Sequence, residues 1–414
     1  MEKPFAIVPS VGPVRADQIV GRDRKILILL RLLRSQSVCI EDIRRMGKTL
    51  MLQKLTHLCN TDMLPPEFAE ENFKAQYFTF QGKKNLGDVI ELLIDGLKDF
   101  KARYKIDFVK TYQFIRSIFP TPGMEVGGVK VNLNLPEYKR SWKAIFSTTL
   151  EEIAAVQEKT GSKLILIFDE LPIMLWDWYK EGRQDEAKEF LDMMRERRQT
   201  LETKGLRFIY CGSIGINVVL STFRKELKYT GEPTNDMMDF DLGPFSVAEA
   251  NFLCECFLLA NFKTDPHEKA ACFSLIYELS NGLPYYISLL FNVIQKGFNR
   301  EVTPVNIKAA YTSILNDTRY RKAFKQLIER LEIYYSPEWK NEMIKALNFL
   351  SGCDAPISEE LIFDEIKSPS KGLLNEILYT LLGDYYLNRE ILEGKRLYSF
   401  KYQIFKEWWK INKV

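Results

Sequence analysis

One stretch constrains the fold of this 414-residue chain more than any other, the segment Val38–Leu50 with the sequence VCIEDIRRMGKTL. It begins with apolar residues typical of a short strand, passes through a polar turn, and opens a helix that continues with Met51 and Leu55. Gly47–Thr49 lies at the junction of the turn and the helix. Free backbone N–H groups and the positive end of a helix dipole meet at such a junction, so the segment predicts a site for a phosphate group.

The residues at this junction also predict which phosphate compound binds. A lysine and a hydroxyl here suit a nucleoside triphosphate with magnesium, because Lys48 reaches the β and γ oxygens and Thr49 ligates the metal. The segment meets the pattern G-x-x-x-x-G-K-[S/T] except at its first position, where Asp42 replaces glycine.

Asp42 weakens the prediction of hydrolysis more than that of binding. Glycine at this position frees the backbone to turn, and aspartate tolerates unusual backbone angles better than most residues. Its carboxylate would nevertheless oppose a triphosphate unless it is turned away or paired, with Arg44 or Arg45 as the candidate partners. On this interpretation, Asp42→Gly should raise ATP affinity or turnover.

Further strands alternate with helices along the first half of the chain. Gln76–Gln81 is aromatic and β-branched, while Lys163–Glu170 and Leu206–Cys211 are apolar on both faces, as in buried central strands. Such alternation predicts a parallel sheet wrapped by helices. Ligands of these sheets bind at the carboxyl ends of the strands, where this chain places Asp42–Thr49, Asp169-Glu170 and Ser213.

These polar residues suit phosphate chemistry. Magnesium needs a carboxylate close to the phosphates, usually through water, and Asp169 is placed for that role. Glu170 can polarise an attacking water, and Ser213 can orient that water or the γ-phosphate. Each has an alternative interpretation, since Asp-Glu often caps the following segment and a serine beside glycine is often a turn residue. Their joint occurrence favours nucleotide binding.

Composition limits the other classes of function. The net charge is +3, so no overall field selects a polyanion. His57 and His267 are the only histidines, which argues against histidine-based hydrolysis or metal chemistry. Cys254 and Cys256 form the only close cysteine pair, so we expect reduced thiols rather than a zinc site. Neither a signal pattern nor an apolar run of ~20 residues occurs, which predicts a cytoplasmic protein without membrane contact.

Changes in the pattern of apolar and polar residues divide the chain into three predicted domains. Residues 1–235 form the sheet-containing core, with a β-hairpin inserted at about 120–137 around Gly127-Gly128. No strand is expected between Cys211 and the C-terminal domain, and residues 236–335 are read as helices. Residues 336–414 are read as three helices, two strands and a final helix, the arrangement of a winged helix.

Six segments carry a resemblance to a known family, and they are Val20-Gly-Arg22, Arg44–Thr49, Leu164–Glu170, Gly212–Gly215, Leu242–Phe245 and Gly282-Leu-Pro284. They resemble the AAA+/STAND superfamily of P-loop ATPases, most closely the small AAA-like ATPases of prokaryotes. The resemblance implies an α/β fold of the P-loop NTPase (AAA+/ASCE) type, with a parallel sheet core, a helical lid and a C-terminal winged-helix domain.

The resemblance also implies the cofactors, ATP and Mg2+, and a set of site residues. Asp169 and Glu170 match the Walker B end, and Ser213 matches the sensor 1 position. Arg44 and Arg45 are expected to contact phosphate or to support the loop. The implied nucleotide-binding residues are Val20, Gly21, Arg22, Arg44, Arg45, Met46, Gly47, Lys48, Thr49, Leu50, Gly282 and Pro284, with Thr49 and Asp169 at the metal.

An ATP-driven conformational switch is the activity that the resemblance implies, acting on a partner or effector protein in antiviral defence or stress response. Hydrolysis in this family often needs an arginine from a neighbouring subunit of an oligomer. Arg195, Arg197 and Arg198 are candidates, although a solvated helix face is the favoured interpretation. A nucleotide-binding scaffold with little hydrolysis is the alternative.

DNA binding, as in an ATPase of the replication-initiator type, is a further alternative. Residues 338–414 carry eleven Lys and Arg against twelve Asp and Glu, so this module offers no excess charge to phosphates. Its third helix carries only Lys371 and Glu376 as charges, although Lys395 and Arg396 at the wing could touch a backbone. The basic stretch 319–330 is the better polyanion candidate. A regulatory or protein-contact role is favoured over DNA.

Overall fold

The computed structural model describes residues 3–10, 12, 14–61, 63–104 and 136–412. The chain forms two compact units, which we call the sheet unit (residues 23–41 and 48–242) and the lid unit (residues 1–22, 42–47 and 243–414). Residues 42–47, the turn between the first strand and its helix, belong to the lid unit although their neighbours in the chain on both sides belong to the sheet unit.

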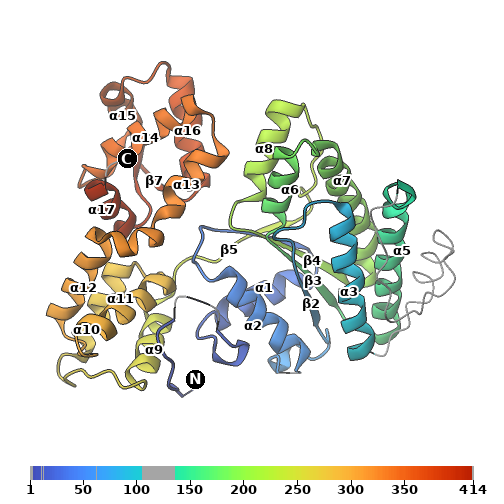
Figure 1. Cartoon of the computed structure of the whole chain (residues 1–414), viewed down its shortest axis with the longest axis horizontal. Helices are drawn as coiled ribbons and strands as arrows, with labels where there is room; N and C mark the ends of the chain where they lie inside the picture. The colour runs from blue at the N-terminus through green and yellow to red at the C-terminus, as the bar shows by residue number, and fades with distance from the viewer. Residues whose placement is uncertain (1–2, 11, 13, 62, 105–135, 413–414) are drawn as a thin grey trace. The chain divides into compact units, whose positions relative to one another are not determined.

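Five parallel strands form the core of the sheet unit, in the order β2-β3-β4-β1-β5 (Figure 1). Every residue of β3 and β4 is buried, as their continuous apolar sequences predict. Because the strands are parallel, their carboxyl ends lie at one edge, and the predicted α/β P-loop NTPase fold class is confirmed. The strands are β1 (Val38–Glu41), β2 (Lys74–Thr79), β3 (Leu164–Asp169), β4 (Leu206–Cys211) and β5 (Met238–Asp241).

Strand β5 corrects the expectation that no strand lies between Cys211 and the C-terminal domain. It pairs with β1 in parallel register, Phe240 opposite Ile40. Phe240 is the one buried residue among its four, so the sequence carries almost no periodic signal for it. The predicted end of the core at residue 235 falls before this strand, whereas the sheet unit extends to Leu242.

Nine helices of the described chain belong to the sheet unit, counting one short 3-10 helix in the connection to β2 and another before β4. Asn85 caps α3 by accepting a hydrogen bond from the N–H of Asp88 at 3.0 Å, as its position predicts. The helices are α1 (Asp23–Leu33), α2 (Lys48–Asn60), α3 (Leu86–Tyr104), α5 (Pro136–Thr160), α6 (Leu171–Lys180), α7 (Gln184–Leu201) and α8 (Ile216–Leu227), and the 3-10 helices are η2 (Pro66–Phe68) and η3 (Glu202–Lys204).

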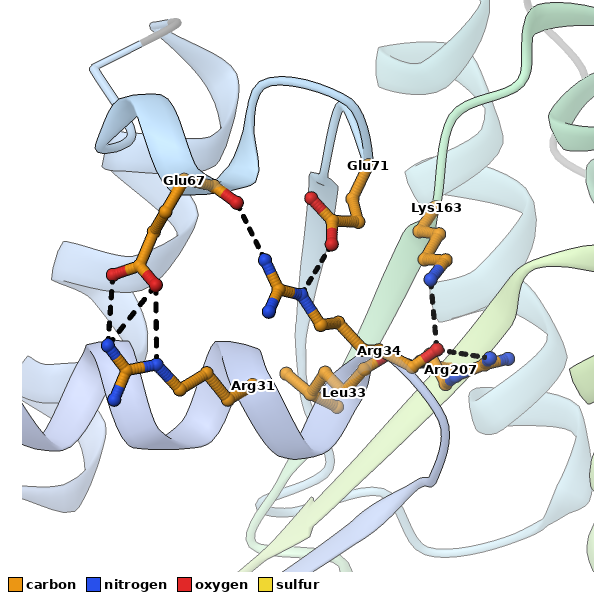
Figure 2. A network of polar contacts seen from close by, with 7 residues as sticks. All are labelled: Arg31, Leu33, Arg34, Glu67, Glu71, Lys163 and Arg207. Atoms are coloured by element: carbon orange, nitrogen blue, oxygen red, sulfur yellow. Dashed lines mark hydrogen bonds and ion pairs between the residues drawn. The ribbon is translucent and has the colours of Figure 1, made fainter.

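Cationic side chains fix the end of α1 to the amino ends of the central strands (Figure 2). The last carbonyls of a helix lack partners within it, and a cation near them also favours the helix dipole. Lys163, just before β3, donates to the carbonyl of Arg34 at 2.9 Å, and Arg207 of β4 donates to the carbonyls of Arg34 and Leu33 at 3.0 Å each. This anchor lies at the strand ends opposite to the carboxyl edge.

Between residues 247 and 351 the lid unit is built from helices. Ser246 and Glu249 form the predicted capping box at the start of α9, which confirms that reading. The elements are η1 (Ala16–Gln18), α9 (Val247–Leu258), α10 (Lys269–Ser280), α11 (Pro284–Gly297), α12 (Pro304–Asn316), η4 (Thr318–Ala323), α13 (Lys325–Tyr334) and α14 (Pro337–Ser351).

A small antiparallel sheet in the order β6-β8-β7 completes the C-terminal part of the lid unit. Glu393 and Gly394 join β7 to β8 with φ of 49° and 77°, the left-handed values of a tight hairpin turn. Three helices and this two-stranded wing follow the predicted order. The elements after α14 are β6 (Ile357–Ser358), α15 (Glu359–Ile366), α16 (Lys371–Gly383), β7 (Leu387–Leu392), β8 (Lys395–Phe400) and α17 (Gln403–Asn412).

Two further sequence predictions are the inserted β-hairpin and the absence of a membrane-spanning segment. The β-hairpin expected at about 120–137 lies outside the described residues, apart from Pro136 and Glu137, which begin α5. None of the helices in the described part of the chain has the length and apolar character needed to cross a membrane.

Candidate functional site

The hydroxyl and the carboxylate predicted as metal ligands meet in the sheet unit. Thr49 is the second residue of α2, and Asp169 is the last residue of β3. The Thr49 hydroxyl donates a hydrogen bond to Oδ2 of Asp169 at 2.8 Å. Asp169 is only 3% exposed. A hydroxyl oxygen beside a carboxylate is a hard donor set of the kind that Mg2+ prefers, so these residues fit the predicted metal.

Asp169 has further donors. The N–H of Glu170 donates to Oδ1 at 3.1 Å, and the hydroxyl of Tyr77 donates to Oδ2 at 2.5 Å. Burial raises the pKa of Tyr77, and the charge of Asp169 raises it further. Sequence analysis did not identify Tyr77, because an aromatic residue inside a strand is usually core. The order of the strands, which places β2 beside β3, is the signal that would have found it.

Glu170 and Ser213 contact each other directly. Oε2 of Glu170 accepts hydrogen bonds from the N–H of Ser213 at 2.9 Å and from its hydroxyl at 3.0 Å. Glu170 has φ 60° and ψ 24°, a left-handed conformation that is uncommon for glutamate, at the residue just before α6. The structure therefore brings the predicted base and the predicted orienting group together, with the carboxylate held by a main-chain donor and a side-chain donor.

The charges of this cluster affect the thiol of Cys211, the last residue of β4. Burial raises the pKa of its thiol well above the usual value, Asp169 and Glu170 raise it further, and Lys48 opposes the rise. These effects favour the neutral thiol. Lys48 is 6% exposed at the first position of α2. The sheet unit thus gathers the predicted residues Lys48, Thr49, Asp169, Glu170 and Ser213 at the carboxyl edge, with Leu50 half-buried one residue along α2.

Asp42 is held by backbone N–H groups and not by the arginines expected from the sequence. It is 2% exposed. Its Oδ1 accepts from the N–H of Ile43 at 2.8 Å, and its Oδ2 accepts from the N–H of Gly243 at 2.9 Å. The predicted pairing with Arg44 or Arg45 is wrong, because Arg44 is exposed and Arg45 makes other contacts. The carboxylate instead connects the turn to the segment before α9.

Arg22 makes a second connection between the same segments. Its side chain donates to the carbonyls of Met46 at 2.6 Å and Gly243 at 2.8 Å, and its guanidinium lies 4.6 Å from the ring centre of Phe245. Its backbone N–H donates to Oε1 of Glu249 at 2.7 Å. Burial lowers the pKa of Arg22 to about 10, against the opposing effects of Glu249 and Asp42. The side chain expected near an adenine therefore serves to join parts of the lid unit.

Close packing explains two glycines of the lid unit. Gly21 has φ +74°, and a Cβ there would meet the Phe245 ring at 3.0 Å. Gly282 has φ +66°, and a Cβ there would meet the carbonyl oxygen of Phe245 at 2.7 Å. Its own carbonyl accepts from the N–H of Phe245 at 2.8 Å. The predicted lid segments Leu242–Phe245 and Gly282–Pro284 are therefore in contact, and Pro284 begins α11.

Arg45 contacts the lid helices from within the turn. Its guanidinium lies 4.1 Å from the ring centre of Tyr285 and donates to the carbonyl of Lys322 at 2.6 Å. Arg45 has φ 73°. These contacts support the structural role among the two that the sequence left open. The lid unit thus holds the other predicted nucleotide-binding residues, which are Val20, Gly21, Arg22, Arg44, Arg45, Met46, Gly47, Gly282 and Pro284.

The arginines of α7 do not form the solvated face favoured from the sequence. Arg198 is fully buried, and it donates to Asp236 at 3.0 Å and to the carbonyl of Pro233 at 2.7 Å. Arg197 pairs with Glu151 at 2.8 Å. The sequence shows only a charged helix, because the partner of Arg198 lies 38 positions further along the chain. Arg198 is therefore a structural residue and not an arginine available to another subunit.

Comparison with known proteins shows the fold. No model of a protein family matches the chain, and no curated protein matches it. The solved structure of the Aeropyrum pernix ORC2 protein in ADPNP-ADP complexes is similar over 94% of this chain and 92% of that chain, with 11% identity and a TM-score of 0.54. The ADP form of the same protein has a TM-score of 0.43 and 12% identity, with 91% of this chain and 88% of that chain covered. The Thermotoga maritima RuvB Holliday junction branch migration motor has a TM-score of 0.37 and 10% identity, with 94% of this chain and 95% of that chain covered. With its parallel five-stranded sheet and the strand–turn–helix at Val38–Leu50, the chain has the fold of the AAA+ P-loop ATPases.

Proposed function

We propose that this protein binds ATP with Mg2+, hydrolyses it, and acts as a STAND-like conformational switch for a partner protein. The observation that carries the proposal is the cluster at the carboxyl edge of the sheet unit, where Thr49 contacts Asp169 at 2.8 Å and Glu170 contacts Ser213 at 2.9 Å. A hydroxyl, two carboxylates and the buried Lys48 at the start of a helix are the groups that phosphoryl transfer requires.

Each residue has a role in this proposal. Lys48 would bind the β and γ oxygens of the triphosphate, while Thr49 and Asp169 would hold Mg2+. Bound Mg2+ would neutralise charge on the phosphate oxygens. Glu170 would accept the proton of a water that attacks the γ-phosphate, after which ADP and phosphate leave. Both bonds from Ser213 are made to Oε2 of Glu170, so Oε1 is the oxygen that would accept this proton.

The switch is supported by the contacts of the turn 42–47. The turn follows the strand that leads to the proposed phosphate site, yet Asp42 is bonded to Gly243, just before α9, and Met46 is bonded to Arg22, just before α1. A change in the turn on nucleotide binding would therefore alter the contacts of Gly243 and Arg22. This gives the lid unit a physical means of responding to ATP. From the family resemblance, we place the partner in prokaryotic antiviral defence or stress response.

The partner surface that we propose is the wing of the C-terminal part. Ile391 is 70% exposed and Leu392 is 62% exposed at the end of β7, and apolar side chains of this size favour a protein partner or a second copy of this chain. Arg396 lies 3.7 Å from Glu359, which offsets its charge. These observations support a protein partner over DNA.

The test of the proposed function compares ATP binding and ATP turnover in Glu170→Gln. The substitution keeps the size of the side chain and removes the base, so we expect ATP binding to persist and turnover to fall by about 100-fold or more. Glu158→Gln, an exposed residue of α5, is the matched control and should leave both unchanged. Turnover that persists in Glu170→Gln would remove Glu170 from the mechanism. ATP binding without turnover in the unmodified protein would support the scaffold alternative.

A further inference from the structure

We infer that Tyr77 is a positioning residue of the magnesium site, because its hydroxyl fixes the orientation of the Asp169 carboxylate. The inference rests on the proposed function and adds a residue to it. Tyr77 lies on β2, separated in sequence from every motif of the site. It carries no charge and belongs to no nucleotide-binding pattern in this chain, so only its contact assigns it a role.

The hydrogen-bonding positions of Oδ2 of Asp169 are filled. Oδ2 accepts from the Tyr77 hydroxyl at 2.5 Å and from the Thr49 hydroxyl at 2.8 Å, while Oδ1 accepts from the N–H of Glu170 at 3.1 Å. A carboxylate oxygen offers about two lone-pair positions. The two hydroxyls therefore fill Oδ2 from two different elements, β2 and α2. Such a carboxylate cannot rotate about its terminal bond without breaking both bonds.

The register of the sheet explains how Tyr77 reaches this carboxylate. In the parallel pair of β2 and β3, Thr79 lies opposite Asp169 and Tyr77 lies opposite Ile167. Residues two apart on a strand share a face, so Tyr77 points to the same face as Thr79 and Asp169. A tyrosine is long enough to extend past one residue along its strand and place its hydroxyl at the strand end. Serine or threonine at this position would be too short.

The Tyr77 contact matters for metal binding because Asp169 is one of the two residues proposed to hold Mg2+. Residues that hold a metal ligand in orientation are worth about 10- to 100-fold in metal affinity or activity. When Mg2+ binds, the Thr49 hydroxyl would turn from Asp169 toward the metal, and Tyr77 would remain as the side-chain donor on Oδ2. Tyr77 would thus keep Asp169 in place in the state in which the carboxylate is used.

Tyr77→Phe tests the inference, because it removes the hydroxyl and keeps the ring. The measurement is the dissociation constant for ATP in EDTA and at rising Mg2+ concentration, with thermal unfolding recorded alongside. We expect unchanged ATP affinity in EDTA, and a loss of about tenfold in the degree to which Mg2+ tightens ATP binding. A hydroxyl with only a structural role would lower the melting temperature on removal and leave the Mg2+ effect unaltered.

Tyr229→Phe is the matched control. Tyr229 lies in the same unit, and its hydroxyl donates to a carboxylate oxygen of Asp192 at the same 2.5 Å. This variant should show the full Mg2+ effect. If Tyr77→Phe also shows the full effect, the inference is wrong while the proposed function stands. If the unmodified protein binds no ATP in EDTA or in Mg2+, the proposed function itself fails.

Discussion

The carboxylate of Asp42 accepts a hydrogen bond from the backbone N–H of Gly243, 201 positions away in the sequence, at 2.9 Å. A glycine at position 42 could not make this contact. The residue that breaks the nucleotide-binding pattern is therefore used by the lid unit, which explains how a buried carboxylate is accommodated in the turn.

Asp42→Gly should destabilise the lid unit, which changes the expectation drawn from the sequence. The substitution leaves the half-buried N–H of Gly243 without this acceptor, and the loss of such a hydrogen bond costs about 0.5–1.5 kcal/mol. Urea unfolding of the variant measures this loss. Arg44→Ala, at the exposed residue two positions on, should change the free energy of unfolding by less than about 0.5 kcal/mol. Equal stability of Asp42→Gly and the unmodified protein would show that the contact contributes nothing.

The same contact gives a direct readout of the proposed switch. Hydrogen exchange at the Gly243 amide should change when ATP is added to the unmodified protein, because the acceptor of that amide belongs to the turn. In Asp42→Gly we expect ATP to leave exchange at Gly243 unaltered, provided that binding is first confirmed by calorimetry. An ATP effect of the same size in both proteins would argue against transmission through Asp42.

Stability in acid should depend on Glu249. Burial alone would raise its pKa, but hydrogen bonds from Ser246 and Arg22 and the charge of Arg22 lower it below its ordinary 4.5. Because the folded pKa is the lower one, ionised Glu249 stabilises the fold above pH 4.5, and this contribution is lost as the pH falls through the folded value.

The measurement is the free energy of unfolding between pH 3 and 7, a range chosen to span the ordinary carboxylate pKa of about 4.3. Glu249→Gln should be less stable at neutral pH and should lose less stability on acidification than the unmodified protein. Glu278→Gln, at an exposed residue of α10, is the control that should keep the unmodified slope. Parallel pH curves for all three proteins would exclude the Glu249 contribution.

Arg198 and Arg197 should respond very differently to removal. Arg198→Ala leaves Asp236 without its buried partner, and breaking such a pair costs about 3–5 kcal/mol. Arg197→Ala removes a half-buried surface pair with Glu151, worth about 0–1 kcal/mol. Chemical unfolding separates the two. If Arg198→Ala were fully stable but lost an ATPase activity that depends on oligomer formation, the residue would act in trans after all.

Removing the apolar tip of the wing should abolish partner binding without affecting the fold. Ile391→Ser with Leu392→Ser changes two exposed side chains, so unfolding should shift by less than about 0.5 kcal/mol for each. Co-purification with the proteins expressed alongside, with and without ATP, is the readout. Val305→Ser, 75% exposed on α12, is the control for a general loss of apolar surface. Retained partner binding would place the contact elsewhere, and salt-sensitive DNA binding would revive that alternative.

Local patterns predicted most of the framework. Continuous apolar runs predicted β3 and β4, and the Ser246–Glu249 spacing predicted the cap of α9, because neighbouring residues decide these features. Strand β5 was missed because an edge strand with one buried residue has no periodicity to detect. The same logic fails for Arg198, whose helix looks charged and exposed until Asp236 is brought against it.

The sequence alone therefore determined the parallel sheet, its carboxyl edge, and the gathering of Thr49, Asp169, Glu170 and Ser213 at that edge. These follow from chain direction, since parallel strands must end at the same edge. Only the tertiary structure decided that Asp42 pairs with Gly243 and that Tyr77 holds Asp169. Both contacts join segments distant in the chain, and their partners depend on strand order and side-chain packing, which hydrophobic periodicity does not encode.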